Sequence, residues 1–216
     1  MALLRSAITG WAAGGVHAHA AQAEARTLGE RVGLRSVVLV EGVSDRVAVE
    51  SLAVRIGREL DAEGVCVVPM GGAMSIGRFL ELFGAAGLDV QIAGLCDVGE
   101  EPYFQRALER AGRGVHLDRQ RMQALGFYVC MVDLEDELIR SLGASAVLNV
   151  LKAEGDDRTF QTFQRQPAQR ARPVEQQLRR FMGTISGRKE RYARSLVDAL
   201  DLARLPDPFE LLLARV

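Results

Sequence analysis

The stretch "SVVLVEGVSDRVAVESLA" (residues 36–53) decides the fold of this 216-residue chain. Residues 36–40 form an apolar run of strand length that ends on Glu41. A glycine follows, and a second carboxylate, Asp45, stands four residues after the first. A buried strand that ends on a pair of acids raises the question of what holds those acids together.

A helical pattern follows this strand directly. Ala48, Leu52, Ile56 and Leu60 recur on one helical face, and Ser44 is the predicted N-cap. The strand-then-helix order then repeats, with further strands predicted over three ranges: 65–69, 90–95 and 126–132. Apolar strands without polar alternation, separated by helices, predict an α/β fold with a parallel, Rossmann-like sheet covered by helices on both faces.

The patterns divide the chain into three parts. Residues 1–35 are alanine-rich and predict an N-terminal helical segment, and residues 36–140 hold the α/β core. Residues 141–216 contain no strand-like run and predict a helical C-terminal region, which is basic over residues 158–194.

The composition fits an ordinary cytoplasmic protein, with 48% hydrophobic and 25% charged residues. The N-terminus lacks the apolar core of a signal peptide, and no run reaches the roughly 18 apolar residues of a membrane span. Cys66, Cys96 and Cys130 have no paired spacing, so they indicate neither a disulfide framework nor a zinc site. We therefore expect no membrane contact, and the sequence does not indicate an oligomeric state.

Acids follow three of the predicted strands. Glu41 follows the first strand and Asp97 the third, and Asp133 and Glu135 follow the fourth. Ligands of open parallel sheets bind outside the carboxyl ends of the strands, so these carboxylates are expected at one edge. Because clustered carboxylates repel one another unless a cation shares them, and because hard oxygen ligands suit Mg²⁺ or Mn²⁺, the pattern predicts a site for one or two such ions.

A structural interpretation competes with this one. Acids just after strands often cap helix N-termini, each for roughly 0.3–1 kcal/mol, and this explains Asp45, Glu100, Glu101 and Asp136 equally well. Glu41 is different, because it precedes a glycine and does not open a helix.

The ordered set "VVLVEGVSDRVAVESLA", "VVPMGGAMSIGRFLELF" and "IAGLCDVGEE" resembles the TOPRIM domain, the metal-binding fold of topoisomerases, primases and several nucleases. The family's marks are a strand-end Glu-Gly and a later Asp-x-Asp. Within that group the chain is most similar to the nucleases of the OLD family, through Asp45, the "GGA" after the second strand, "LEDEL" after the fourth and a late lysine. The resemblance covers about residues 36–140.

The resemblance implies the roles of the site residues. Glu41 and Asp97 would hold one metal, while Asp45 and Glu135, together with Asp133, would serve a second. Glu41 is thereby also expected to be catalytic.

Lys189, in "SGRKERYA", is similar to the family's late lysine. That lysine would be catalytic by stabilising charge that develops on the phosphate. A plain surface lysine remains the alternative interpretation.

Two features depart from the family pattern. The chain reads Asp97-Val98-Gly99 where the family has Asp-x-Asp, so Glu100 or Glu101 would have to supply the missing ligand. OLD nucleases also carry an ATPase domain, yet no G-x-x-x-x-G-K-[ST] loop is present here, because "GTISGRK" has the wrong spacing. Any ATPase is therefore expected on a separate chain, or is absent.

The basic part of the C-terminal region predicts a nucleic-acid partner. It holds ten cationic residues against Glu175 and Glu190: Arg158, Arg165, Arg170, Arg172, Arg179, Arg180, Arg188, Lys189, Arg191 and Arg194. Such a surface binds phosphates without reading sequence. Four interleaved aromatic residues suit either base stacking or a core, and the core is favoured by their spacing: Phe160, Phe163, Phe181 and Tyr192.

Together these observations predict a metal-dependent nuclease that nicks or cleaves DNA. Two alternatives stay open. One is an RNA-processing TOPRIM nuclease, and the other is a non-catalytic nucleic-acid-binding or regulatory module in which Gly99 marks a decayed site.

Overall fold

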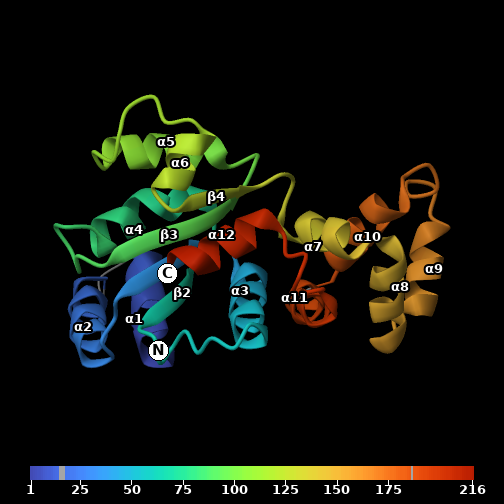
Figure 1. Cartoon of the computed structure of the whole chain (residues 1–216), viewed down its shortest axis with the longest axis horizontal. Helices are drawn as coiled ribbons and strands as arrows, with labels where there is room; N and C mark the ends of the chain where they lie inside the picture. Colours follow the sequence, from blue (N-terminus) through green and yellow to red (C-terminus); the bar gives the residue numbers. More distant parts are fainter. Residues whose placement is uncertain (15–17, 186) are drawn as a thin grey trace.

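The structure is a computed structural model that describes residues 1–14, 18–185 and 187–216. Its centre is a four-stranded sheet in the order β2-β1-β3-β4 (Figure 1), and every neighbouring pair of strands is parallel. The strands are β1 (Ser36–Val40), β2 (Val65–Pro69), β3 (Gln91–Asp97) and β4 (Phe127–Cys130). The predicted α/β class is confirmed.

The fourth strand ends two residues earlier than predicted. The carboxylate of Glu137 accepts a hydrogen bond from the backbone N–H of Met131 at 2.7 Å, so that amide is bound to a side chain. Met131 and Val132 therefore belong to the connection that leads to the next helix and are exposed.

Helices cover both faces of the sheet. Alternate residues of β1 enter different cores: Val37 and Leu39 face one side, and Val38 and Val40 the other. The first side is covered by α1 (Ala2–Ala13), α2 (Ala18–Arg31), α4 (Ile76–Phe83), α5 (Glu101–Arg110) and α6 (Arg119–Ala124), with the short 3₁₀ helix η1 (Ala73–Ser75) before α4.

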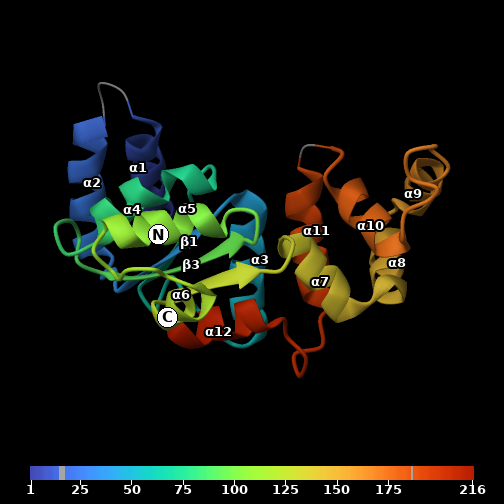
Figure 2. The same cartoon turned by 90° about the horizontal axis from the view of Figure 1, so that it is seen from above.

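The second side is covered by α3 (Val43–Arg55) and α12 (Asp207–Arg215). The same core continues into a group of helices that stand beyond the strand ends (Figures 1 and 2): α7 (Leu134–Leu142), α8 (Ala144–Ala153), α9 (Asp157–Gln164), α10 (Val174–Met182) and α11 (Arg188–Ala199). Thus the last helix, α12, returns to the sheet although it follows the helical group in the chain.

The N-terminal segment is helical in the part that the structure describes. It forms two helices, α1 and α2, and α1 ends at Gly14, whose φ of 77° suits a residue without a side chain. Residues 15–17, between the two helices, lie outside the described part of the chain.

The start of α3 also differs from the prediction. Gly42, and not Ser44, is the N-cap, and the side chain of Asp45 accepts a hydrogen bond from the Gly42 N–H at 2.7 Å. The helix ends at Arg55, so Ile56 is 37% exposed even though it continues the apolar period.

Helices α3 and α11 run side by side with their N-termini at the same edge of the sheet. At the other end of the pair, Arg55 of α3 donates hydrogen bonds to the carbonyl oxygens of Val197 and Leu200, where α11 ends. Arg58 similarly donates hydrogen bonds to the carbonyl oxygen of Leu213, in the last turn of α12, and to that of Val216, which follows the helix. These arginines thus donate to carbonyl oxygens at the C-terminal ends of helices, where few backbone N–H donors remain.

The aromatic residues of the basic region belong to the core. Phe160, Phe181 and Tyr192 are at most 1% exposed, so they cannot stack on bases at the surface. The three cysteines are free and buried, as small apolar residues would be. Among the described residues, no helix combines the length and apolar character needed to cross a membrane.

Candidate functional site

The carboxyl ends of the strands carry the predicted acids. β1 and β3 are neighbours in the sheet, and the chain leaves them in opposite directions, to β2 and to β4. Glu41 directly follows β1, and Asp97 is the last residue of β3. The first two predicted ligands therefore flank the point where ligands bind in open α/β sheets.

A glycine loop closes over the backbone of Glu41. The N–H groups of Gly71 and Gly72 point to the carbonyl oxygen of Glu41, at 3.0 and 3.3 Å. Both glycines have positive φ angles, 71° and 118°, which residues with side chains rarely adopt. The "GGA" segment thus supports the strand end from the side of β2.

Asp45 lies at the first turn of α3, with one oxygen bound to the Gly42 N–H. Burial raises the pKa of Asp45 to about 7, and the charges of Glu135 and Glu41 add to the effect. Asp45 is therefore both a helix cap and a member of the acid cluster, so the two interpretations of this residue do not exclude each other.

Asp97 and Glu100 complete the cluster on the side of β3. Burial, and then the charges of neighbouring acids, beginning with Asp133, raise the pKa of Asp97 to about 8. Burial and the closeness of Glu41 raise the pKa of Glu100 to about 7. The Oε2 atom of Glu100 is buried and has no hydrogen-bond donor. These carboxyl groups therefore resist becoming negative together unless a cation joins them.

Glu135 and Lys189 form an ion pair between α7 and α11. The Lys189 Nζ lies 3.2 Å from Oε1 and 3.3 Å from Oε2 of Glu135, and only the contact with Oε2 has hydrogen-bond geometry. Glu135 is 4% exposed, whereas the Lys189 side chain is about half exposed. The lysine is therefore held at the acid cluster and is still open to a ligand.

Asp133 is occupied by protein donors. Its Oδ1 accepts the Asp136 N–H at 2.9 Å and thereby caps α7, and its Oδ2 accepts the Nε–H of Arg179 at 2.5 Å. This aspartate has a structural role in the arrangement described, and it brings a guanidinium group to the edge of the acid cluster.

Two further acids have partners of their own. Glu101 pairs with Arg119 at 2.6 Å, and Asp136 pairs with Arg140 at 3.0 Å. Of the two glutamates considered as replacements for the missing aspartate, Glu100 is thus the one that faces the cluster. At Gly99 a Cβ atom would meet nothing within 4 Å, so the structure has open space at the position of the missing side chain.

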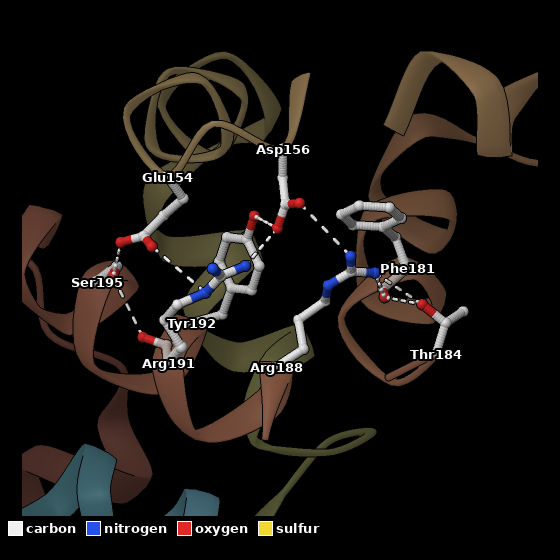
Figure 3. A network of polar contacts seen from close by, with 8 residues as sticks. All are labelled: Glu154, Asp156, Phe181, Thr184, Arg188, Arg191, Tyr192 and Ser195. Atoms are coloured by element: carbon white, nitrogen blue, oxygen red, sulfur yellow. Dashed lines mark hydrogen bonds and ion pairs between the residues drawn. The ribbon is translucent and has the colours of Figure 1, made fainter. Parts of the chain in front are cut away.

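A second polar network fixes the helix that carries Lys189 (Figure 3). Asp156 accepts hydrogen bonds from the Tyr192 hydroxyl at 2.9 Å and from Arg191, and it pairs with Arg188 at 3.5 Å. The Arg188 guanidinium also lies 4.1 Å from the ring centre of Phe181. Because these residues flank Lys189, the network sets the position of the lysine from the side of the helical group.

The donor set fits a hard divalent cation. A small pocket of about 10 Å³ lies at this edge, and Glu41, Asp45 and Asp97 line it together with four apolar or thiol side chains: Leu95, Cys96, Cys130 and Leu134. The unsatisfied oxygens of Glu100 and Glu135 lie in buried positions of the same cluster. In the side-chain arrangement seen, no three acidic, histidine or cysteine residues of the described part form a closed ligand set, so the acids are neighbours and not a finished cage.

The structure divides the ten basic residues into two groups. Four pair with acids: Arg179, Arg188, Lys189 and Arg191. The other six are exposed and have no acidic partner among the described residues: Arg158, Arg165, Arg170, Arg172, Arg180 and Arg194. The basic surface is therefore smaller than the net excess of eight charges predicted.

Sequence reasoning missed Arg179 as a site residue. It stands 46 residues after Asp133, inside a run of other arginines, and nothing in its local sequence separates it from its exposed neighbour Arg180. Only the packing of α10 against α7 brings it to the acids.

This parallel sheet, with acids at the carboxyl ends of its strands, is a TOPRIM-like α/β fold. Residues 34–98 match the protein-family model described as "Overcoming lysogenization defect protein-like, TOPRIM domain", so this part of the chain is similar to an OLD-like TOPRIM domain. Such a domain suggests a nuclease-type function, and TOPRIM domains generally bind divalent metal ions.

Solved structures agree with this assignment. The C-terminal region of the Xanthomonas campestris pv. campestris OLD protein superimposes with a TM-score of 0.69 at 25% identity, covering 87% of this chain and 94% of that one. The C-terminal region of the Burkholderia pseudomallei OLD protein shares the fold, with a TM-score of 0.66 at 21% identity over 84% of this chain and 96% of that one. A search of curated proteins found no significant match.

Proposed function

We propose that this protein is a divalent-metal-dependent nuclease that nicks or cleaves DNA phosphodiester bonds. The observation that carries the proposal is the meeting of acids from separate strand ends with a lysine from α11, in an OLD-like TOPRIM domain. Phosphodiester cleavage needs both elements, because a cation must balance the carboxylates and positive groups must receive the phosphate.

The proposed metal ligands are Glu41 and Asp97 for a first ion. Asp45, Glu100 and Glu135 would serve a second ion, with Asp133 beside them as the residue that positions Arg179. When bound, Mg²⁺ or Mn²⁺ would supply Lewis-acid activation of water and charge stabilisation on the phosphate. The raised pKa values of Asp45, Asp97 and Glu100 mean that these carboxyl groups do not all ionise easily without a cation beside them. This supports cation binding at this edge.

The chain's own cations would hold the phosphate. Lys189 has two donors to spare beyond its contact with Glu135 and is half exposed, so it can donate to a phosphate oxygen without leaving the cluster. Arg179 contacts Asp133 at the N-terminus of α7, and its side chain is 39% exposed. In this arrangement Lys189 is the proposed catalytic cation and Arg179 a second phosphate contact.

The six exposed arginines support nucleic acid as the partner. None of them pairs with an acid among the described residues, which favours binding of a phosphate backbone regardless of sequence. We place DNA before RNA as the substrate, and RNA cleavage is the alternative to be tested on structured transcripts. A separate ATPase chain is the further proposed partner.

The experiment that tests the function is a plasmid assay. Purified protein is incubated with supercoiled DNA in Mg²⁺, in Mn²⁺ and in EDTA, next to Glu41→Ala and to Glu30→Ala, an exposed acid of α2 far from the strand ends. We expect nicked or linear product with metal only, its loss in Glu41→Ala and full activity in Glu30→Ala. Intact plasmid and intact RNA under every metal condition would contradict the proposal.

A non-catalytic binding module is the second candidate, and Gly99 is the observation in its favour. A chain that lacks the second aspartate of Asp-x-Asp has lost one ligand of the family pattern. Gel shifts that show salt-sensitive DNA binding, together with no turnover in any metal, would select this candidate.

A further inference from the structure

Exposed apolar side chains surround the acid edge. They come from the connections after all four strands and from the first turns of the helices that follow. We call this set the apolar rim: Val43, Met74, Val98, Tyr103, Met131 and Val132, with exposed fractions between 37% and 81%.

Exposed apolar side chains are more frequent in these four connections than elsewhere in the described residues. In the described residues, six of the fourteen exposed large apolar side chains belong to these four connections, which make up about an eighth of the chain. Single exposed apolar residues are normal on a protein surface, but several around one edge mark an interaction site.

Backbone hydrogen bonds tie the rim to the acids. The loop before Met74 is bound to the carbonyl of Glu41 through Gly71 and Gly72. The N–H of Val98, next to Asp97, donates to the carbonyl of Cys130 at 3.0 Å, which brings Val98 beside the connection of Met131 and Val132. The connections that carry the rim are therefore joined to the backbone next to the acids.

The chemistry of a nucleotide fits this combination. Its phosphate is charged and belongs with Lys189 and Arg179, while the faces of its base are apolar and lie only a few bonds away. In a closed duplex the base faces are stacked inside, so the rim could meet them only if the strand is unpaired or locally unstacked. Apolar side chains that insert between bases stabilise such distorted strands.

A protein partner fits less well. A protein surface sealed on the rim would bury the enclosed carboxylates without water, and burying charges that lack partners is costly. A single DNA strand, in contrast, leaves the acids accessible to ions and water. It also brings a phosphate, which Lys189 and Arg179 can bind.

We propose that the apolar rim contacts the bases next to the phosphate at the acid edge, so that the chain selects DNA that is single-stranded or unstacked at the cleavage position. This inference rests on the proposed function, because it assumes that the acid edge receives a phosphodiester.

The test compares intact and abasic strands in a binding assay without turnover. A labelled single-stranded oligonucleotide, and the same strand with abasic sites in place of its central bases, are titrated by fluorescence anisotropy in Ca²⁺ and in EDTA. The rim variant is Met74→Ser/Val132→Ser, at positions 81% and 39% exposed. The matched control is Leu3→Ser/Leu148→Ser, at positions 73% and 39% exposed and away from the strand ends.

We expect the wild-type protein and the control to bind the intact strand about tenfold more tightly than the abasic strand, and the rim variant to lose most of that ratio. An equal ratio in the rim variant and in wild type, or no preference for the intact strand in wild type, overturns the inference. If the plasmid assay shows Glu41-dependent nicking while the abasic ratio is unaffected by the rim, only the rim assignment fails. If nicking is absent but the ratio depends on the rim, the base contact holds and the catalytic proposal fails.

Discussion

Two regions of the molecule supply the charges of the proposed site. The carboxyl edge of the sheet supplies the acids, and the helical group α7–α11 supplies the cations. Each acid of the edge stands directly after a strand or at the first turn of the next helix, so its position follows from local chain order. Lys189 and Arg179 reach the same place from α11 and α10, across 54 and 46 residues of chain from the acids they contact. The anionic half of the site is therefore local in origin, and the cationic half depends on tertiary packing.

This difference predicts different consequences of mutation. Substitutions of the acids should affect metal binding and leave the strands in place. Substitutions of Lys189 or Arg179 should also weaken the contact between the sheet and the helical group. The following predictions, from the largest expected effect to the smallest, test that division.

Removing Lys189 gives the largest expected effect among the cations. Lys189→Ala should lower kcat about 10²- to 10³-fold, similar to the loss of one preorganised charge-stabilising donor in other enzymes. The chain's other lysine, Lys152, is exposed on α8, and Lys152→Ala should leave kcat unchanged. Single-turnover nicking rates at saturating metal measure both, and equal rates for the two variants would show that Lys189 is not a catalytic cation.

Arg179 and Arg180 offer a matched pair one residue apart. Arg179→Ala removes the partner of a mostly buried aspartate and should lower the free energy of unfolding by about 1–3 kcal/mol and kcat about tenfold. Arg180→Ala, at an exposed position, should change the free energy of unfolding by at most about 0.5 kcal/mol. Urea titrations and nicking rates on both variants check this, and identical stabilities would mean that the Arg179–Asp133 contact does not join the two regions.

Restoring the missing acid should strengthen the anionic half alone. Gly99→Asp enters open space and places one further carboxylate at the edge, so Mn²⁺ affinity measured by calorimetry should rise severalfold. Gly99→Ala adds the Cβ without the charge and should leave the affinity near that of wild type. Weaker metal binding in Gly99→Asp than in Gly99→Ala would show that this position lies outside the ligand set.

The smallest expected effect is a pH dependence of stability. Asp45, Asp97 and Glu100 have raised pKa values in the folded protein, so between about pH 4 and pH 8 the folded state holds protons that the unfolded state has released. Their contribution therefore favours folding at the acidic end of this range and is lost as pH rises through about 7 to 8.

Thermal unfolding in EDTA can isolate the contribution of these carboxyl groups to stability. The Tm of Asp97→Asn relative to wild type should rise by a few degrees between pH 5 and pH 9, because the variant no longer gains a charge in the cluster. Mg²⁺ should stabilise wild type more at pH 9 than at pH 5. A Tm difference between variant and wild type that does not change with pH would contradict the acid cluster as described.

Local chain order explains why much of the fold was predictable. The four apolar runs lie at or within two residues of the strands, because buried parallel strands have few alternatives for such sequences. The acids at the strand ends were predictable for the same reason, since the end of a run is visible in the sequence and the carboxyl ends of parallel strands share an edge.

The remaining features depend on contacts that no local pattern reports. The carboxylate of Glu137 ends β4 early by binding the Met131 amide, and Asp45 caps α3 from inside the helix, so Gly42 and not Ser44 is the N-cap. The separation of Arg179 from Arg180, and of paired from unpaired arginines in general, requires knowing which helices pack together. The division of the chain at residues 35 and 140 likewise stays a prediction.

The hydrogen bonds from Arg55 to the end of α11 have a consequence for how the enzyme proposed here would be switched on. They join two parallel helices at one end, and the Glu135–Lys189 ion pair and the Asp156 network hold α11 at the other. The Lys189 side chain thus loses conformational entropy during folding, before any substrate binds. The acids, in contrast, are neighbours that repel one another until an ion joins them. If the proposed function holds, the free concentration of the divalent ion would then set the fraction of molecules ready to act.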